Sequence, residues 1–293
     1  MIRRAVIILL ICCGMAAGKS CPAGWSQYKN RCFMFVSTER TWAESERYCI
    51  SMGGNLASVH SREEYNFIDS LFSTHRVWIG GCDAVQEGHW LWSDGTKFDY
   101  TLWNPGEPNN SVLDCPANCS TPPEQIHTLQ AILLPVLALA SSMISRAVLI
   151  LPICCGVASA WIECCPKDWF PYFERCFKFD STPRTWIDAE QYCQSIGGNL
   201  ASIHSSDEYV YIQGMIHKLT NTNPRTWIGG WDAAQEGLWL WSDGSKFDYT
   251  RWIPGEPNNR GGAENCIEMN TLEMMWWNDL PCNLARAALC SLS

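Results

Sequence analysis

A run of oxygen-bearing side chains lies near the C-terminal end of the sequence, between Gly255 and Cys282. Five of them are carboxylates or amides of the kind that bind calcium: Glu256, Asn258, Glu264, Asn278 and Asp279. Calcium takes roughly 6–8 oxygen ligands, so such a set leaves one or two positions for backbone, water or a bound molecule. The Glu256-Pro257-Asn258 triplet alone would indicate an ordinary polar turn. Because further ligands stand just before Cys266 and Cys282, the stretch predicts a calcium site that is open to a ligand.

The same residues resemble the C-type lectin family. The resemblance rests on EPN at 256–258, on the glutamate eight residues after its first member, on WND at 277–279 and on the flanking cysteines; it covers residues 165–293 completely and 21–110 in part. It implies an α+β fold in which two helices pack on small antiparallel sheets beside a long calcium-binding loop. It also implies that Pro257 is cis.

The resemblance implies a disulfide pattern as well. Sequence alone permits 15 connectivities for six cysteines. The long-form lectin pattern implies Cys165–Cys176, Cys193–Cys290 and Cys266–Cys282, with Cys21 and Cys32 as disulfide cysteines of the earlier unit.

The EPN triplet implies a sugar class. EPN lectins favour sugars with equatorial 3- and 4-hydroxyl groups, namely mannose, N-acetylglucosamine and fucose. Two neighbouring hydroxyls would coordinate the calcium, donate to Glu256 or Glu264, and accept from Asn258 or Asn278. The resemblance therefore implies a calcium-dependent protein that binds microbial or cell-surface glycans, as proteins of innate immunity do.

A second group of residues matches an accessory calcium site found in some of these lectins: Asp232, Glu236, Asn259 and Asn265. Asn259 and Asn265 stand where acidic ligands are usual, so we expect this site to be weak or empty. A surface turn explains the same residues equally well.

Composition places the chain in an oxidising compartment. It has 293 residues, 17 of them cysteine, without the CxxC spacing of a zinc finger. The net charge of −9 argues against nucleic acid as a partner. Residues 1–18 carry Arg3-Arg4, an apolar run and small residues, which predicts a secretory signal peptide and a secreted protein. The run is too short to span a membrane as a helix, and we expect no stable membrane insertion.

The chain repeats itself. Residues 1–14 recur at 143–156 with 11 of 14 positions identical, and 88–110 match 237–259 at 19 of 23. We therefore divide the chain into a signal peptide at 1–18, a truncated lectin-like unit at 19–110, an unstructured junction at 111–142, a second signal-like segment at 143–160 and a complete lectin unit at 161–293. Two fused reading frames would produce the same arrangement. An oligomer is compatible with either.

The first unit holds half a site. Glu107 and Asn109 repeat the EPN ligands, but the later acidic ligand, the WND triplet and a closing strand have no counterparts, and Cys49 lacks an equivalent of Cys290. We expect this unit neither to bind sugar nor to fold well alone.

Local patterns in the second unit predict its elements. Thr185 opens a helix that Gly197-Gly198 end, and Ser205 with Glu208 forms a capping box for a second helix. Residues 226–229 and 238–241 are expected to be strands, and the tryptophans to support the core.

The chain is not expected to be an enzyme. It contains no GxSxG, HExxH or GxxxxGK[ST] motif, and its histidines have no nucleophile at a family spacing. The alternatives to sugar binding are a lectin-fold protein that binds another protein and one that binds ice, like an antifreeze protein. An ice-binding protein would need a flat binding face, and a protein-binding module would not need all five calcium ligands.

Overall fold

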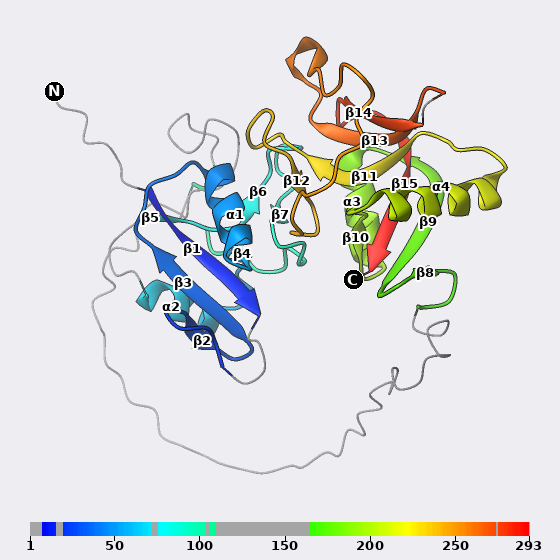
Figure 1. Cartoon of the computed structure of the whole chain (residues 1–293). Coiled ribbons are helices and arrows are strands. Elements are labelled where there is room, and N and C mark those ends of the chain that lie inside the picture. Colours follow the sequence, from blue (N-terminus) through cyan, green and yellow to red (C-terminus); the bar gives the residue numbers. More distant parts are fainter. Residues whose placement is uncertain are drawn as a thin grey trace.

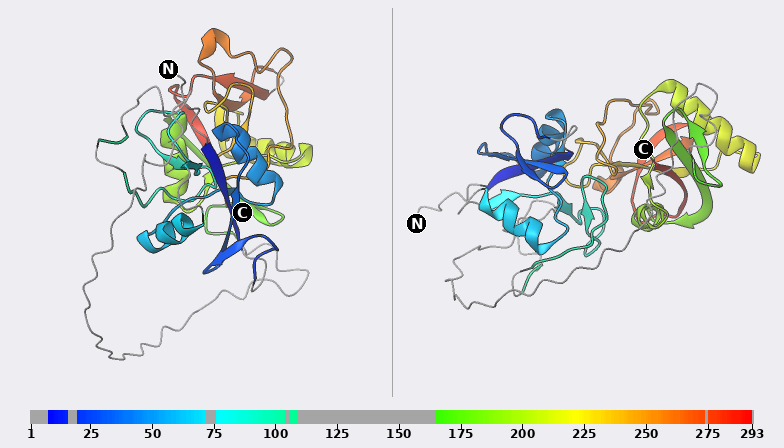
Figure 2. Two further views of the ribbon diagram at one scale, coloured as in Figure 1. Left: turned by 90° about the vertical axis from the view of Figure 1, so that its left-hand side faces the viewer. Right: turned by 90° about the horizontal axis from the view of Figure 1, so that it is seen from below.

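The computed structural model describes residues 8–15, 20–71, 76–103, 106–108, 165–273 and 275–292. They form two units, one on each side of residues 109–164 (Figure 1). In the right-hand view of Figure 2, strands of the first unit and the longest helix of the second lie at opposite ends of the molecule. The predicted junction at 111–142, the second signal-like segment at 143–160 and Asn109 lie outside the described residues.

The second unit is built on a sheet of eight strands. Its elements in chain order are β8 (Phe170–Tyr172), β9 (Arg175–Arg184), α3 (Trp186–Ser195), β10 (Asn199–Leu200), α4 (Ser206–Thr220), β11 (Thr226–Trp231), β12 (Leu240–Trp241), the 3₁₀ turn η2 (Arg260–Gly262), β13 (Cys266–Thr271), β14 (Trp276–Leu280) and β15 (Arg286–Leu292). The strand order is β14-β13-β11-β15-β9-β8, with β10 on β15 and β12 on β11. This confirms the α+β class. The sheet is mixed rather than wholly antiparallel, because β15 runs parallel to β11 after a long connection.

The two helices begin where their caps predict. The Thr185 side chain accepts from the backbone of Asp188 at the start of α3, and Ser205 accepts from Glu208 at the start of α4. The expected capping box at α4 is incomplete, because the Glu208 carboxylate does not return to Ser205. It accepts instead from the backbone of His204 at 2.7 Å and pairs with Arg175 at 2.5 Å. A buried ion pair to β9 thus takes the place of the reciprocal cap.

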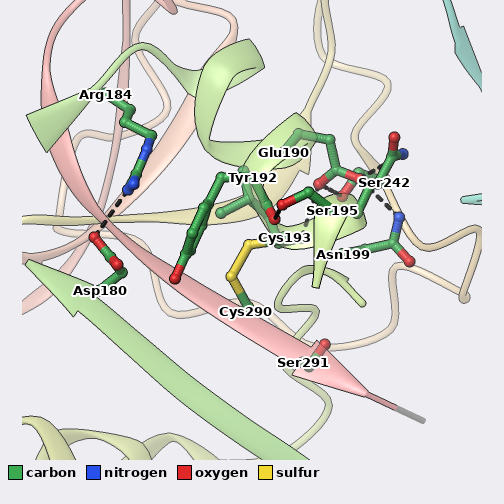
Figure 3. The surroundings of a disulfide bond; sticks show 12 residues. Asp180, Arg184, Glu190, Tyr192, Cys193, Ser195, Asn199, Ser242, Cys290 and Ser291 are labelled. Atoms are coloured by element: carbon green, nitrogen blue, oxygen red, sulfur yellow. Dashed lines mark hydrogen bonds and ion pairs between the residues drawn. A yellow bond between two sulfur atoms is a disulfide. The ribbon is translucent and has the colours of Figure 1, made fainter. Parts of the chain in front are cut away.

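Helix α3 is joined to the sheet by a disulfide and by a buried carboxylate. Cys193 is bonded to Cys290 of β15 (Figure 3). One turn earlier, Glu190 is fully buried and accepts from the backbone of Leu200, from Asn199 and from Ser242 at 2.7–2.8 Å. These bonds tie the helix to β10 and to the turn after β12. Burial raises the pKa of the Glu190 carboxyl, so its donors offset only part of the cost of removing it from water.

The remaining disulfides of this unit link Cys165 with Cys176 and Cys266 with Cys282, the same pairing as the resemblance implies. The predicted core role of the tryptophans also agrees with their burial. Trp277 of β14 is fully buried and packs edge-on against Trp241 with ring centroids 5.7 Å apart, and against Tyr209 at 6.2 Å. The strand that carries the WND triplet is therefore anchored in the aromatic core.

The first unit repeats much of this plan in shorter form. Its elements are β1 (Ile8–Met15), β2 (Ser26–Tyr28), β3 (Arg31–Val36), α1 (Trp42–Ser51), β4 (Asn55–Leu56), α2 (Arg62–Ser70), β5 (Arg76–Trp78), β6 (Gly81–Cys82) and β7 (Leu91–Trp92). Strands β2, β3, β1 and β4 form a sheet in that order, with β5 also on β1, and β6 pairs with β7. Cys21 is bonded to Cys32.

The expectation that this unit lacks a closing strand is wrong. Strand β1 pairs antiparallel with β3 and β4 and parallel with β5, just as β15 pairs with β9, β10 and β11. Cys12 of β1 is bonded to Cys49, which therefore does have a partner. The apolar run fits this position because a central strand is buried on both faces and needs no polar alternation. The signal-peptide interpretation of residues 1–18 stays a prediction, and cleavage there would remove this strand.

We predict that the first unit folds only when residues 8–15 are present. A fragment of residues 20–108 would lose three strand pairings and the Cys12–Cys49 disulfide, and removing a native disulfide alone costs about 2–5 kcal/mol. Thermal unfolding followed by circular dichroism should show a cooperative transition for 8–108 and none for 20–108. Cooperative unfolding of the shorter fragment would contradict this, and N-terminal sequencing of secreted protein would show which form is released.

Candidate functional site

Strand β14 brings the predicted calcium residues of the second unit together. On one edge it pairs with β13, opposite Ile267 and Glu268. On the other edge, Trp277 donates from its backbone to Arg251 at 2.8 Å and accepts from Ile253 at 3.0 Å. The chain that enters the EPN triplet is therefore hydrogen-bonded to the strand that ends in WND. Residues more than 20 positions apart in sequence meet at one end of the sheet.

Asp279 fixes the loop to this strand. Its side chain is fully buried and accepts from the backbone N–H of Asn258 at 3.2 Å and of Asn259 at 2.8 Å. Hydrogen bonds to a carboxylate are among the stronger ones in proteins. Asp279 thus has a structural role in addition to its predicted role as a calcium ligand.

Glu264 is held by the turn that precedes it. Its carboxylate accepts from the backbone of Arg260 at 2.8 Å, and its own N–H donates to the Asn259 side chain at 3.0 Å. Asn259 has the left-handed backbone angle φ of 43°, which asparagine tolerates better than most residues. Sequence reasoning assigned Asn259 only to the accessory site and missed this role.

Glu256 and Asn258 lie beside each other at the exposed end of the site. The Asn258 amide donates to Glu256 Oε1 at 2.8 Å, and the peptide bond between Glu256 and Pro257 is cis, as expected. The other carboxylate oxygen, Glu256 Oε2, is buried and has no hydrogen-bond partner. Burial raises the pKa of Glu256, and the charges of Asp279 and Glu264 raise it further. Among the described residues, no ion pair to Lys, Arg or His neutralises the charge of Glu256, Glu264 or Asp279.

Asn278 is placed differently from the other four residues. It is half-buried, whereas its neighbours Trp277 and Asp279 in β14 are buried. Because side chains alternate along a strand, Asn278 faces away from Asp279. Within the described residues its side chain forms no hydrogen bond to the other four. That part of the chain also contains no group of three or more His, Cys, Asp or Glu side chains gathered closely enough to hold a metal. In the described arrangement Glu256, Glu264 and Asp279 are thus bonded to groups of the loop and are not gathered around a common point, and Asn278 lies to one side.

The accessory residues form a neighbouring cluster. The Asn259 side chain donates to Glu236, and Asp232 accepts from the backbone of Gly237 at 2.7 Å. Asn265 takes part through its backbone carbonyl, which accepts from the N–H of Asp232 at 3.1 Å. Asp232 Oδ1 is buried without a partner. Burial, with the charges of Glu236 and Asp279, raises the pKa of Asp232 to about 7.

The half-site of the first unit is only partly described. Glu107 is half-buried and precedes a cis proline, as Glu256 does, while Asn109 lies outside the described residues. The described part of the first unit ends at residue 108, before any segment equivalent to β13 or β14.

The structure also forms a contact that sequence reasoning did not find. His204 lies 3.0 Å from Ser202 Oγ and 2.9 Å from Asp248, an order of groups that resembles a hydrolytic triad. The Ser202 hydroxyl is buried, donates to Asp243 at 2.5 Å and accepts from Arg175 at 2.9 Å. Its proton is therefore engaged away from the histidine, and its oxygen is not accessible to a substrate. Ser58, His60 and Asp99 repeat the arrangement in the first unit, so we interpret it as a structural network.

Comparison with known proteins shows the family. A model of the lectin C-type domain matches residues 38–121 and 182–292, which together make up more than half of the chain. The chain therefore belongs to the C-type lectin family. The lectins of this family bind carbohydrate and have no enzymatic activity, in agreement with the expectation from sequence.

Three relatives illustrate the range of the family. The chain is 51% identical to ladderlectin of Oncorhynchus mykiss over 118 residues, 40% of this chain and 62% of that protein. It is 47% identical to the galactose-specific lectin nattectin of Thalassophryne nattereri over 127 residues, 43% of this chain and 79% of that protein. A type-2 ice-structuring protein of Hemitripterus americanus is 42% identical over 99 residues, 34% of this chain and 60% of that protein. The chain thus spans less than two thirds of the length of two of these three.

Among the residues that the structure describes, no helix is both long and apolar enough to cross a membrane.

We predict that two carboxylates of the site affect stability in opposite directions when calcium is absent. Glu256→Gln keeps the oxygen that accepts from Asn258 and removes repulsion with Asp279, so unfolding in EDTA should occur at the same or a higher temperature. Asp279→Asn is similarly isosteric but turns an NH₂ group toward a backbone N–H, so it should lower stability by about 1–3 kcal/mol.

Both substitutions should abolish the rise in unfolding temperature that calcium produces. Differential scanning calorimetry in EDTA and in calcium provides the measurement. An Asp279→Asn protein as stable as wild type in EDTA would show that Asp279 does not hold the loop.

The pKa of Asp232 predicts a pH dependence of the metal-free chain. The folded state binds this proton more tightly than the unfolded state, in which the pKa is near 3.8. The stabilising contribution of the proton is complete below about pH 4 and is lost as the pH rises through about 7. In EDTA, the proton on Asp232 should therefore contribute less to the free energy of unfolding of wild type at pH 8 than at pH 5. Asp232→Asn should flatten this part of the profile, and identical profiles for the two proteins would contradict the assignment.

Proposed function

We propose that the second unit is a secreted, calcium-dependent carbohydrate-binding domain of the mannose type. Glu256, Asn258, Glu264 and Asp279 would hold the calcium, joined by Asn278 after a change in the orientation of its side chain. The observation that carries this proposal is the buried, partnerless Oε2 of Glu256 beside two further carboxylates. A divalent cation with oxygen ligands would satisfy that oxygen and neutralise the charge.

The contact between Glu256 and Asn258 supports a site for hydroxyl groups. Their side chains share one hydrogen bond, with the amide donating and the carboxylate accepting. A sugar hydroxyl inserted there would donate to Glu256 and accept from Asn258, so one bond would be replaced by two. Calcium, when bound, would supply coordination to two neighbouring hydroxyls. An epimer with a misplaced hydroxyl would cover Glu256 and Asn258 and leave one of them unpaired.

The mannose class rests on the EPN triplet, and nattectin supports a competing assignment. That relative is named as galactose-specific at 47% identity, so galactose is the sugar against which the proposal must be tested. The accessory residues Asp232, Glu236, Asn259 and Asn265 are proposed to bind a second calcium weakly at most, because Asn259 is already bonded to Glu236 and Glu264.

Ice binding is the second candidate function. It is favoured by the 42% identity to an ice-structuring protein. Free mannose would not compete with an ice surface or with a protein partner for the binding site. Inhibition by a monosaccharide therefore separates sugar binding from both.

Secretion and the limits of the first unit belong to the same proposal. Residues 1–18 and 143–160 would act as leader segments, and the released protein would recognise microbial or cell-surface glycans. The first unit, with Glu107 and Asn109 alone, would not bind sugar, since the described part of that unit contains no counterpart of Glu264 or Asp279.

The test is equilibrium binding of mannose and galactose to the whole chain, with calcium and with EDTA. Wild type should bind mannose only in calcium. The double exchange Glu256→Gln with Asn258→Asp keeps the oxygen count and charge but reverses donor and acceptor, so mannose affinity should fall about tenfold or more and galactose should gain relative to it.

The same exchange in the first unit, Glu107→Gln with Asn109→Asp, is the matched control and should change nothing. Wild-type preference for galactose would overturn the sugar class. Surface binding that neither EDTA nor mannose inhibits would move the ice or protein ligand ahead.

A further inference from the structure

The two units touch through the same surface of each. In the second unit this surface consists of Asn199, Trp231, Gln235 and the turn 242–244; in the first it consists of Thr41, Trp42, Asn55 and the turn 93–95. We call it the pairing surface. The asparagines and the turns are equivalent in the two units and contact each other reciprocally, which is the pattern of an isologous contact.

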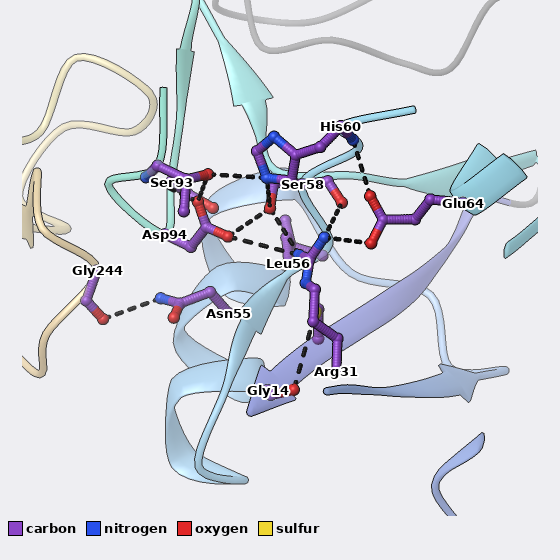
Figure 4. A network of polar contacts seen from close by, with 12 residues as sticks. Gly14, Arg31, Asn55, Leu56, Ser58, His60, Glu64, Ser93, Asp94 and Gly244 are labelled. Atoms are coloured by element: carbon purple, nitrogen blue, oxygen red, sulfur yellow. Dashed lines mark hydrogen bonds and ion pairs between the residues drawn. The ribbon is translucent and has the colours of Figure 1, made fainter. Parts of the chain in front are cut away.

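Two reciprocal hydrogen bonds define the contact. The Asn55 amide donates to the Gly244 carbonyl at 2.9 Å (Figure 4), and the Asn199 amide donates to the Gly95 carbonyl at 3.0 Å. Asn55 and Asn199 are equivalent residues, as are Gly95 and Gly244. The asparagine of each unit therefore contacts the glycine of the other. A contact of this kind is self-complementary.

A buried glutamate orients each of these asparagines. Asn55 also donates to Glu46 at 2.7 Å, and Asn199 also donates to Glu190 at 2.7 Å. An amide group has two N–H donors, so one is held by the unit's own carboxylate while the other reaches across. Both units present their donor already fixed, which lowers the entropy cost of pairing.

The turns approach each other too closely for side chains. A Cβ on Gly95 would lie 2.8 Å from the Cα of Asp243, and one on Gly244 would lie 2.9 Å from the Cα of Asp94. Both glycines thus allow backbone to pack on backbone across the contact.

The contact departs from symmetry around Trp231 and Gln235, and the departure points to the natural partner. Trp231 of the second unit packs against Trp42 with ring centroids 6.2 Å apart, and Gln235 accepts from Thr41 at 3.0 Å. On the other half of the contact, Cys82 stands in place of the indole, beside a cavity lined by Cys82, Leu91, Trp92, Trp231 and Ser242, among others. A second copy of the second unit would bring a tryptophan to this place.

We propose that the pairing surface of the second unit binds a second copy of that unit, and that the first unit occupies it in the uncleaved chain, which retains residues 8–15 and 143–160. In such a pair, the asparagine–glycine bonds would form twice, and so would the contact of Trp231 with Trp186, the equivalent of Trp42. The first unit acts as an internal partner that holds the whole chain as a monomer.

The test opens the internal contact from the side of the first unit alone. Gly95→Ala places a methyl group against the backbone of Asp243 and leaves the second unit unchanged. The freed surface should then pair between chains, so sedimentation equilibrium of the whole chain should show a shift from one chain to two with rising concentration. Wild type should remain a monomer.

Gly88→Ala is the matched control. Gly88 has φ of +75° and Gly95 has +74°, so both substitutions carry the same backbone strain, but a Cβ on Gly88 meets nothing within 4 Å. The control should stay monomeric. The double variant Gly95→Ala with Gly244→Ala, which damages both surfaces, should also stay monomeric.

If Gly95→Ala does not fold, Gly95→Asn tests the same contact, because asparagine tolerates the left-handed region. A folded Gly95 variant that remains a monomer at every concentration, whether compact or opened, would overturn the proposal. A dimer of the double variant would overturn it as well, because association would then use another surface.

Discussion

A central strand bonded to three others holds each unit together. In the second unit it is β15, which pairs with β9, β10 and β11 and is joined by Cys290 to helix α3. In the first unit it is β1, with the same three kinds of neighbour and a disulfide from Cys12 to helix α1. In the second unit this strand follows the loop that carries the EPN triplet, and in the first unit it precedes β2. The fold requires the strand but accepts it from either end of the chain.

This requirement explains what could be predicted from the sequence and what could not. The caps at Thr185 and Ser205 are local, and both helices begin there. The β1 segment is an apolar run whose composition suits both a leader and a buried strand, and only pairing with residues far along the chain distinguishes them. Glu208 illustrates the same limit on a smaller scale. Its spacing predicts a reciprocal cap, but Arg175, distant in sequence, takes its carboxylate.

The candidate site also has features that the sequence predicts and features that it does not. The residue types at Glu256, Asn258, Glu264 and Asp279 are evident from the motifs, and the structure brings these four together. The backbone donors that position their carboxylates could not be predicted from side-chain patterns, because every residue except proline has an N–H and only the loop conformation decides where it points. Asn259 shows this best: its left-handed backbone and its amide both serve Glu264. Strand alternation separates Asn278 from Asp279, which a triplet motif does not reveal.

Because the first unit occupies the pairing surface, it also affects how many ligand sites one molecule can carry. The described chain contains one unit with the full WND strand and one unit without it, and these two face each other. Under the proposed function, such a molecule would be univalent: it would cover a glycan-bearing surface but would not bridge two surfaces. Lectins that agglutinate cells gain strength from several sites acting together, often by factors of about 10²–10⁴. A partner that fills the surface without adding a site would therefore turn a cross-linker into a competitor for glycans.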